Sequence, residues 1–308
     1  MRNYFYAFII LGWMIGHSSA ASASEVPTDK IRVVASFSIL GDMVRVLGSD
    51  KVDIVTLVGP DSDGHLYQPT PSDGKTITKS DLVITNGLHF EGWITRLIDS
   101  ANYRGPVVIA TDGIPALQVN GEPDPHAWQS LENARLYANN ITRALIQLQP
   151  ESANDFAQRN QQFAADTLKL QQIAEQLFNA TPADQRLVVT SHDAFGYFGQ
   201  EYGIQFLAPL GMSTDSEASA SNVAQLIRQI KSQNIRAVFV ENITDPRLME
   251  QVARETDAHI GGSLYSDALS PASGPASTYL AMMRHNITLI SAALEASRDM
   301  ATKDKATN

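Results

Sequence analysis

The sequence predicts an α/β protein with two similar lobes, each built on a mainly parallel four-stranded sheet, joined by one long rigid helix. Short apolar segments alternate with helical patterns in two separate series, which is the order of parallel βαβ units. Residues 151–180, between the two series, contain neither Gly nor Pro and have a helical pattern. Identical residues also recur at matching positions of the two series, among them Val33 with Val188 and Gly41 with Gly196.

Residues 1–23 differ from the rest of the chain and are predicted to be a signal peptide. Arg2 precedes an apolar run at residues 4–15, and the small residues that follow include Ala21-Ser22-Ala23 as a candidate cleavage site. The apolar run is too short to cross a membrane comfortably. The sequence contains no cysteine, so neither a disulfide bond nor a lipid on an N-terminal cysteine is expected. We therefore expect an exported, non-lipidated periplasmic protein.

The N-terminal lobe is expected at residues 24–150. Its first predicted strand, at residues 31–35, is a short apolar segment followed by a helical pattern that stops at Gly48. Three further strands are predicted at residues 52–58, 81–85 and 107–110. A loop rich in Pro, Gly and Asp follows the second of these strands, at residues 59–73.

The linking helix is expected at residues 151–181. Four apolar residues recur every seven positions and, with Ile173 and Phe178, would form one face of the helix: Phe156, Phe163, Leu170 and Leu177. At 1.5 Å per residue, about thirty residues extend roughly 45 Å, which is enough to brace two lobes. The alternative is a coiled-coil dimerisation helix, but the repeat is short for one, so we expect a monomer.

The C-terminal lobe is expected at residues 182–308. Its predicted strands are at residues 187–190, 205–208, 237–240 and 259–264. The formal net charge of the chain is −10, without a basic tail or stripe. Because nucleic acids are bound mainly through Lys and Arg contacts with phosphates, this charge argues against a nucleic-acid partner.

Three of the seven histidines follow predicted strand ends, where a ligand site is expected. His65, His126 and His192 each lie in a loop beyond the carboxyl end of a strand, and Asp267 follows the last strand. In open parallel sheets, ligands bind outside these carboxyl ends. Three imidazoles and one carboxylate meeting across a cleft between the lobes would make a four-coordinate site suited to Zn²⁺.

Other interpretations of these residues remain open from the pattern alone. His192 and Asp267 could cap the helices that follow them. Residues 61–65 could form an Asx turn or part of a calcium loop, although the remaining EF-hand spacing is absent. His89 also follows a predicted strand and is an alternative ligand.

Four motifs surround the candidate ligands: GHLYQPTPSD at residues 64–73, DPHAW at 124–128, VTSHDAF at 189–195 and YSDAL at 265–269. Together they resemble the metal-binding solute-binding proteins of zinc and manganese ABC importers, the cluster A-I or TroA-like superfamily. The resemblance covers essentially the whole mature chain. It implies two lobes joined by a rigid helix, with the metal bound in the cleft between the lobes.

The resemblance also implies the ligands, the cargo and the partner. It makes His65, His126, His192 and Asp267 the metal ligands. A histidine at the third ligand position generally accompanies zinc in this family, and a glutamate accompanies manganese, so the resemblance implies Zn²⁺ as the transported ligand. The implied partner is an inner-membrane ABC permease.

Two features depart from the family pattern. Residues 111–125 contain no histidine, whereas many zinc members have a His-rich loop there. We therefore hypothesise that a separate periplasmic metallochaperone supplies the metal. Gly64 replaces the usual proline before the first histidine, which predicts a more mobile loop at this point.

Three alternative functions are a zinc hydrolase, a manganese-binding protein and a surface adhesin. A zinc hydrolase usually has three protein ligands, an open water position and a nearby base. Here a fourth ligand is available and no HExxH motif occurs, so we expect that the protein is not an enzyme. A manganese-binding protein of the same family is the nearer alternative. A surface adhesin is disfavoured by the missing lipidation cysteine.

Overall fold

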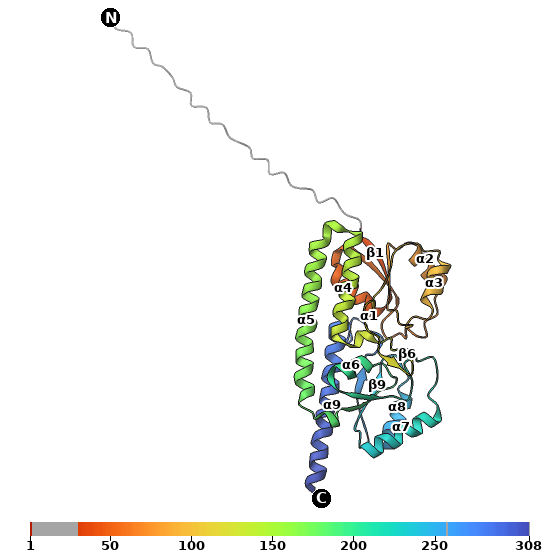
Figure 1. Ribbon diagram of the computed structural model, residues 1–308, viewed down its shortest axis with the longest axis vertical. Helices are drawn as coiled ribbons and strands as arrows, with labels where there is room; N and C mark the ends of the chain where they lie inside the picture. Colours follow the sequence, from red (N-terminus) through yellow and green to blue (C-terminus); the bar gives the residue numbers. More distant parts are fainter. Residues whose placement is uncertain (2–29, 257, 308) are drawn as a thin grey trace.

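The structure is a computed structural model that describes Met1 and residues 30–256 and 258–307. The expected signal peptide at residues 1–23 lies outside the described part, apart from Met1. Two four-stranded parallel sheets lie one above the other along the long axis of the molecule, with long helices beside them (Figure 1). This arrangement confirms the predicted fold class.

The first sheet has the strand order β2-β1-β3-β4. Its strands are β1 (Ile31–Phe37), β2 (Val52–Val58), β3 (Leu82–Thr85) and β4 (Val107–Ile109). Strand β1 lies at the centre, where Val34 pairs with Val55 on one side and with Val83 on the other. All but one of the β1 residues are buried. A continuous apolar segment of this kind is typical of a parallel strand covered on both faces.

The second sheet repeats the topology of the first. Its strands are β7 (Leu187–Val189), β8 (Gln205–Leu207), β9 (Ala237–Glu241) and β10 (His259–Leu264), and their order is β10-β9-β7-β8. In each sheet the first strand is therefore flanked by the second and the third, and the fourth is at the edge. The identical residues Val33 and Val188 lie in the equivalent strands β1 and β7. The weak sequence repeat thus corresponds to a repeat in topology.

Helices cover the two sheets and connect their strands. They are α1 (Ser38–Gly48), α2 (Pro71–Thr78), α3 (Ile94–Ser100), α4 (Leu131–Leu148), α5 (Ala153–Asn179), α6 (Gly196–Tyr202), α7 (Ala220–Gln233), α8 (Arg247–Thr256) and α9 (Tyr279–Thr307). A small antiparallel hairpin, β5 (Gln118–Val119) and β6 (Glu122–Pro123), precedes the short 3-10 turn at Ala127–Gln129. None of the described helices is both long and apolar enough to cross a membrane.

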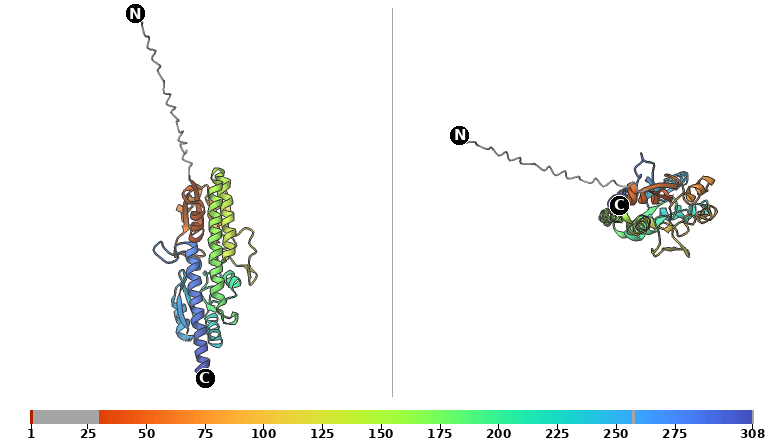
Figure 2. Two further views of the ribbon diagram at one scale, coloured as in Figure 1. Left: turned by 90° about the vertical axis from the view of Figure 1, so that its left-hand side faces the viewer. Right: turned by 90° about the horizontal axis from the view of Figure 1, so that it is seen from above.

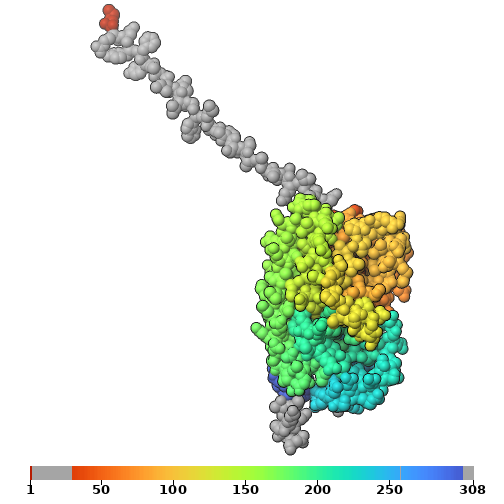
Figure 3. Space-filling view, in the orientation of Figure 1, coloured from red at the N-terminus to blue at the C-terminus, as the bar shows by residue number. Residues whose placement is uncertain are grey.

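The linking helix α5 extends alongside both sheets, and α4 packs against its first half (Figures 1 and 3). Phe156, Phe163, Leu170 and Phe178, all expected on the apolar face, are buried, whereas Ile173 and Leu177, expected on the same face, are 40% and 42% exposed. The physical reason is that a strict seven-residue repeat drifts by about 20° per heptad around a straight α-helix. After three heptads the buried face has moved by one residue. The predicted lobe boundaries on either side of this helix remain a prediction.

A second long helix braces the lobes in addition to α5. The C-terminal helix α9 runs beside α5 and also contacts α1 and the second sheet (Figure 2). At its start, the backbone N–H of Tyr279 donates to Asp42 (2.8 Å) and the Tyr279 hydroxyl donates to the carbonyl of Trp128 (2.7 Å). One large hydrophobic core therefore includes residues from both sheets and from α1, α4, α5 and α9. A smaller core is confined to one side of the second sheet and the helices α7 and α8.

Candidate metal centre

Four predicted ligands come together between the two sheets. The candidate ligand atoms of His65, His126, His192 and Asp267 all lie within 4.8 Å of one another. The side chains of His126, His192 and Asp267 are fully buried, and that of His65 is only 6% exposed. Among the described residues this is the group of His, Asp and Glu side chains that could hold a metal ion.

Strand ends account for the position of each side chain. His65 follows β2, His126 follows β4 and the β5–β6 hairpin, His192 follows β7, and Asp267 follows β10. The carboxyl ends of both sheets face the junction between the lobes, so these four loops converge there. Two ligand candidates therefore come from each half of the chain.

The distances between the candidate ligand atoms are those expected around one small metal ion. The Nε2 atom of His65 lies 3.4 Å from Nε2 of His126 and 3.4 Å from Oδ2 of Asp267. Asp267 Oδ2 lies 3.3 Å from Nε2 of His192, and Asp267 Oδ1 lies 3.7 Å from Nε2 of His126. Four donors about 2.0–2.1 Å from a tetrahedral centre would lie roughly 3.3–3.5 Å from one another. The spacing of the side chains thus fits a small four-coordinate cation.

Several polar atoms of this group lack hydrogen-bond partners. Nε2 of His192 and both carboxylate oxygens of Asp267 are buried without a hydrogen bond to the described protein. Buried polar atoms are normally satisfied, because leaving one unpaired costs free energy. A cation between these atoms would satisfy them, so the donor set fits a metal ion.

Two buried carboxylates lie next to the Nδ1 atoms of two of the histidines, on the ring edge opposite to the candidate ligand atom Nε2, and orient the rings. Oδ1 of Asp124 lies 2.8 Å from Nδ1 of His126 and accepts the backbone N–H of the same residue (2.9 Å). Oε2 of Glu241 lies 2.6 Å from Nδ1 of His192. A proton on Nδ1 that faces a carboxylate leaves Nε2 free to coordinate a metal. The two carboxylates therefore select the ring tautomer that a metal site requires.

Sequence reasoning did not identify Asp124 or Glu241. Asp124 stands two residues before His126 and could have been suspected from the DPH motif. Glu241 is the last residue of β9, so the rule that ligand sites lie at strand ends would also have pointed to it. The sequence alone does not distinguish Glu241 from the many acidic residues at strand ends that face solvent.

Opposite charges shift the pKa values inside the site. Burial alone would lower the pKa of His192, but the carboxylates of Glu241 and Asp267 raise it well above its usual value. Burial alone would raise the pKa of Asp267, but His192 and His126 lower it well below its usual value. In the metal-free protein, a proton on His192 therefore offsets part of the carboxylate charge. A bound cation would replace this proton.

His89, the alternative ligand, does not join the group. It is exposed and lines a pocket of about 340 Å³ next to His65, together with Glu122, Pro125 and Met212. Its backbone has a positive φ of 65°, which turns this segment away from the strand direction. The pocket is therefore lined both by His65 of the candidate metal centre and by the exposed His89.

Fold and site together define a class: a metal-binding component of a transport system, with a cation bound between two α/β lobes. The family described as "ZnuA: Zinc-uptake complex component A periplasmic" matches residues 33–293. The chain belongs to this family, whose members are solute-binding proteins of ABC importers and not enzymes. The hydrolase alternative is thereby excluded. As a solute-binding component, the protein acts outside the cytoplasm with a membrane permease and its ATPase.

Similar proteins differ in the metal that they are named for. The manganese ABC transporter substrate-binding lipoprotein PsaA of Streptococcus pneumoniae is 30% identical over 299 residues, 93% of this chain and 96% of its own. The iron ABC transporter substrate-binding lipoprotein MtsA of Streptococcus pyogenes is 30% identical, with 94% and 96% covered. The structure of the periplasmic zinc-binding protein TroA from Treponema pallidum has a TM-score of 0.83 and 32% identity, covering 86% of this chain and 99% of its own.

Proposed function

We propose that this protein binds Zn²⁺ through His65, His126, His192 and Asp267 and delivers it to an ABC permease for import. The observation that supports this most strongly is the set of donor distances, 3.3–3.7 Å, among three imidazole nitrogens and one carboxylate. Three nitrogen donors and one oxygen donor in a tetrahedral arrangement suit Zn²⁺. Mn²⁺ is usually given more oxygen ligands.

Manganese is the second candidate cargo, because the similar protein PsaA is named for manganese. The carboxylates of Asp124 and Glu241, which lie behind His126 and His192, favour zinc over manganese in this site. Asp124 and Glu241 contact the imidazoles and offer no extra oxygen directly to the centre. The second oxygen of Asp267 could act as a fifth ligand, but a sixth would have to come from water at a site where His126, His192 and Asp267 are fully buried.

We further propose that the mature protein is a non-lipidated periplasmic monomer. The two similar streptococcal proteins are named lipoproteins, whereas this sequence has no cysteine to accept a lipid. The hydrophobic core that both lobes share supports a monomer, because Phe156, Phe163, Leu170 and Phe178 of the long helix α5 are buried within its own chain. A periplasmic metallochaperone as metal donor remains part of this proposal, since residues 111–125 offer no histidine.

The test is the metal content and selectivity of the purified protein. Elemental analysis after purification should give about one zinc per chain, and chelator competition should show tighter binding of Zn²⁺ than of Mn²⁺. The His126→Ala variant should lose zinc, whereas the matched variant His89→Ala should retain it. Wild-type protein without stoichiometric zinc, or a His126→Ala variant with full affinity, would refute the ligand assignment. Tighter binding of Mn²⁺ would overturn the choice of metal.

A further inference from the structure

The loop that contains His65 is fastened to the opposite lobe. The backbone N–H of Asp61 donates to the carbonyl of Leu269 (2.9 Å), and Nδ2 of Asn242 donates to Oδ1 of Asp61 (2.9 Å). Two residues later, the Thr214 hydroxyl donates to Oδ2 of Asp63 (2.5 Å). Residues 61–63 belong to the first half of the chain, and their three partners belong to the second.

Asp63 uses its two oxygens for different purposes. Oδ1 accepts the backbone N–H of His65 (2.8 Å) and that of Leu66 (3.4 Å), which closes the turn that presents the imidazole. Oδ2 accepts the Thr214 hydroxyl from the other lobe. One carboxylate therefore both shapes the backbone at His65 and attaches it to residues 210–218 of the second half.

His65 depends on this turn more than the other two histidines depend on theirs. Within the described part of the chain, no carboxylate faces its Nδ1, unlike His126 with Asp124 and His192 with Glu241. Its ring rests against Phe90, with the ring centroids 4.6 Å apart. The position of its Nε2 is therefore set mainly by the backbone that Asp63 organises.

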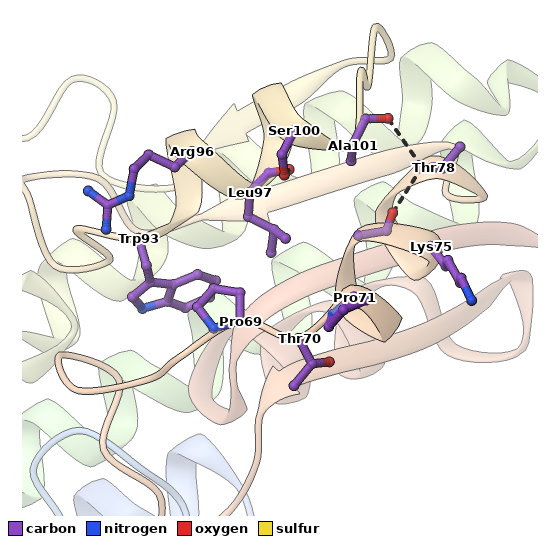
Figure 4. A pocket seen from close by; sticks show the side chains of 11 residues that line it. Pro69, Thr70, Pro71, Lys75, Thr78, Trp93, Arg96, Leu97, Ser100 and Ala101 are labelled. Atoms are coloured by element: carbon purple, nitrogen blue, oxygen red, sulfur yellow. Dashed lines mark hydrogen bonds between the residues drawn. The ribbon is translucent and has the colours of Figure 1, made fainter.

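The other anchor of this loop lies in its own lobe. The buried indole of Trp93 donates from Nε1 to the carbonyl of Gly64 (2.8 Å), and it lines a pocket of about 660 Å³ between α2 and α3 beside Pro69 and Leu97 (Figure 4). A side chain at residue 64 would meet the ring of Phe90 at 2.6 Å, so glycine is required for this close packing. The loop is thus fixed by Trp93 in its own lobe, and by Thr214 and the two Asp61 hydrogen bonds to the second lobe.

The segment of the second lobe that contacts Asp63, residues 213–215, lines two pockets. The pocket of about 340 Å³ that contains His65 includes Ser213 and Asp215 in its wall. A second pocket, of about 610 Å³, has Asp63, Leu66, Thr214 and Asp215 among its lining residues. Breaking the Thr214 contact therefore leaves room for the loop to move without disturbing the hydrophobic core.

We infer that Asp63 is the positioning residue for His65, and that its hydrogen bond with Thr214 is a latch that slows release of the bound metal. This inference rests on the proposed function, because it concerns release of the cargo from the same site. With the latch open, His65 would lose its fixed geometry while His126, His192 and Asp267 stayed in place. The metal would then leave past His65, whose side chain is 6% exposed while those of the other three ligands are fully buried, toward the pocket that adjoins it.

The Thr214→Val variant tests the latch, because valine has nearly the shape of threonine but cannot donate a hydrogen bond. We expect zinc to dissociate into excess chelator roughly tenfold faster, since hydrogen bonds to charged acceptors are among the stronger ones. Thr214→Ser should restore the wild-type rate to within about twofold. Ser216→Ala is the matched control, because its hydroxyl bonds only to the neighbouring Asp215 in the same segment.

A second measurement does not depend on metal binding. In metal-free protein, amide hydrogen exchange of His65 and Leu66 should accelerate in Thr214→Val and return to normal in Thr214→Ser. Unchanged exchange in Thr214→Val would overturn the latch, as would an unchanged dissociation rate in a protein that binds zinc. If the wild type bound no metal, the proposed function would fail, while the exchange data would still decide whether Thr214 fixes the loop.

Discussion

Replacing Glu241 with glutamine tests how the protein prepares His192 to coordinate a metal. Oε2 of Glu241 lies 2.6 Å from Nδ1 of His192, and Oε1 accepts the backbone N–H groups of Ser191 (2.8 Å) and His192 (2.9 Å). Glutamine can retain the two backbone hydrogen bonds through its own oxygen. Its NH₂ group then faces Nδ1, which must act as an acceptor, so the ring proton moves to Nε2.

The expected loss of affinity follows from this change of tautomer. A protonated Nε2 cannot coordinate, and restoring the other tautomer would set two buried donors against each other. Loss of an outer-shell partner of a metal-binding histidine typically costs 10- to 100-fold in affinity. That range corresponds to about 1.4 to 2.8 kcal/mol. We expect Glu241→Gln to weaken zinc binding by this amount without changing the stoichiometry.

Chelator competition on the purified variant measures this effect. Glu255→Gln, on the exposed face of α8, removes one negative charge elsewhere on the same lobe and is the control. An affinity of Glu241→Gln within about threefold of wild type would refute the tautomer argument. An equal loss in the control would attribute the effect to net charge instead.

Three further predictions concern pH, the outer carboxylate of His126 and the linking helix. Because neighbouring carboxylates raise the pKa of His192, protons should compete for this ligand already above the ordinary histidine range, so zinc affinity should begin to fall there and keep falling as the pH drops through that range; a flat competition profile would contradict this. Gly196→Ala would place a methyl group 2.5 Å from Oδ2 of Asp124, so its zinc affinity should fall, whereas Gly211→Ala, which meets open space, should not affect binding. Leu170→Ala, at a site 2% exposed, should lower the free energy of unfolding by about 2–5 kcal/mol in urea titrations, unlike truncation of an exposed leucine of the same helix.

Periodicity and strand-end reasoning predicted most of the framework from the sequence. Strands β2 and β10 begin and end at the predicted residues, and the other six strands of the two parallel sheets differ by one or two residues at an end, whereas the β5–β6 hairpin was not predicted. Short apolar segments bounded by turn residues define parallel strands well, because these strands are buried on both faces. The same reasoning predicted which loops meet, because the carboxyl ends of parallel strands share one edge of the sheet.

Contacts that depend on three-dimensional packing could not be predicted in this way. Thr214 lies in a loop with no periodic pattern, and its bond with Asp63 joins residues far apart in the sequence. The bracing role of α9 was not predicted either, because an amphipathic pattern shows that a face is buried but not which partner buries it. Leu177 was misplaced because its predicted position assumed a seven-residue period over too many turns.

The two hydrophobic cores imply that different parts of the molecule unfold as separate cooperative units with different free energies. The large core joins β1, α1, α5 and α9 and includes residues of both lobes, so these elements should unfold together and neither lobe should fold well alone. The small core, in which α7 and α8 pack against one face of the second sheet, contains few buried side chains. Thr214 lies just before α7, at the margin of this small unit. Native-state hydrogen exchange should therefore find a sub-global opening of α7 and α8 well below the global free energy of unfolding, and this opening would loosen the α8 side of the pocket that is also lined by Asp63 and Thr214.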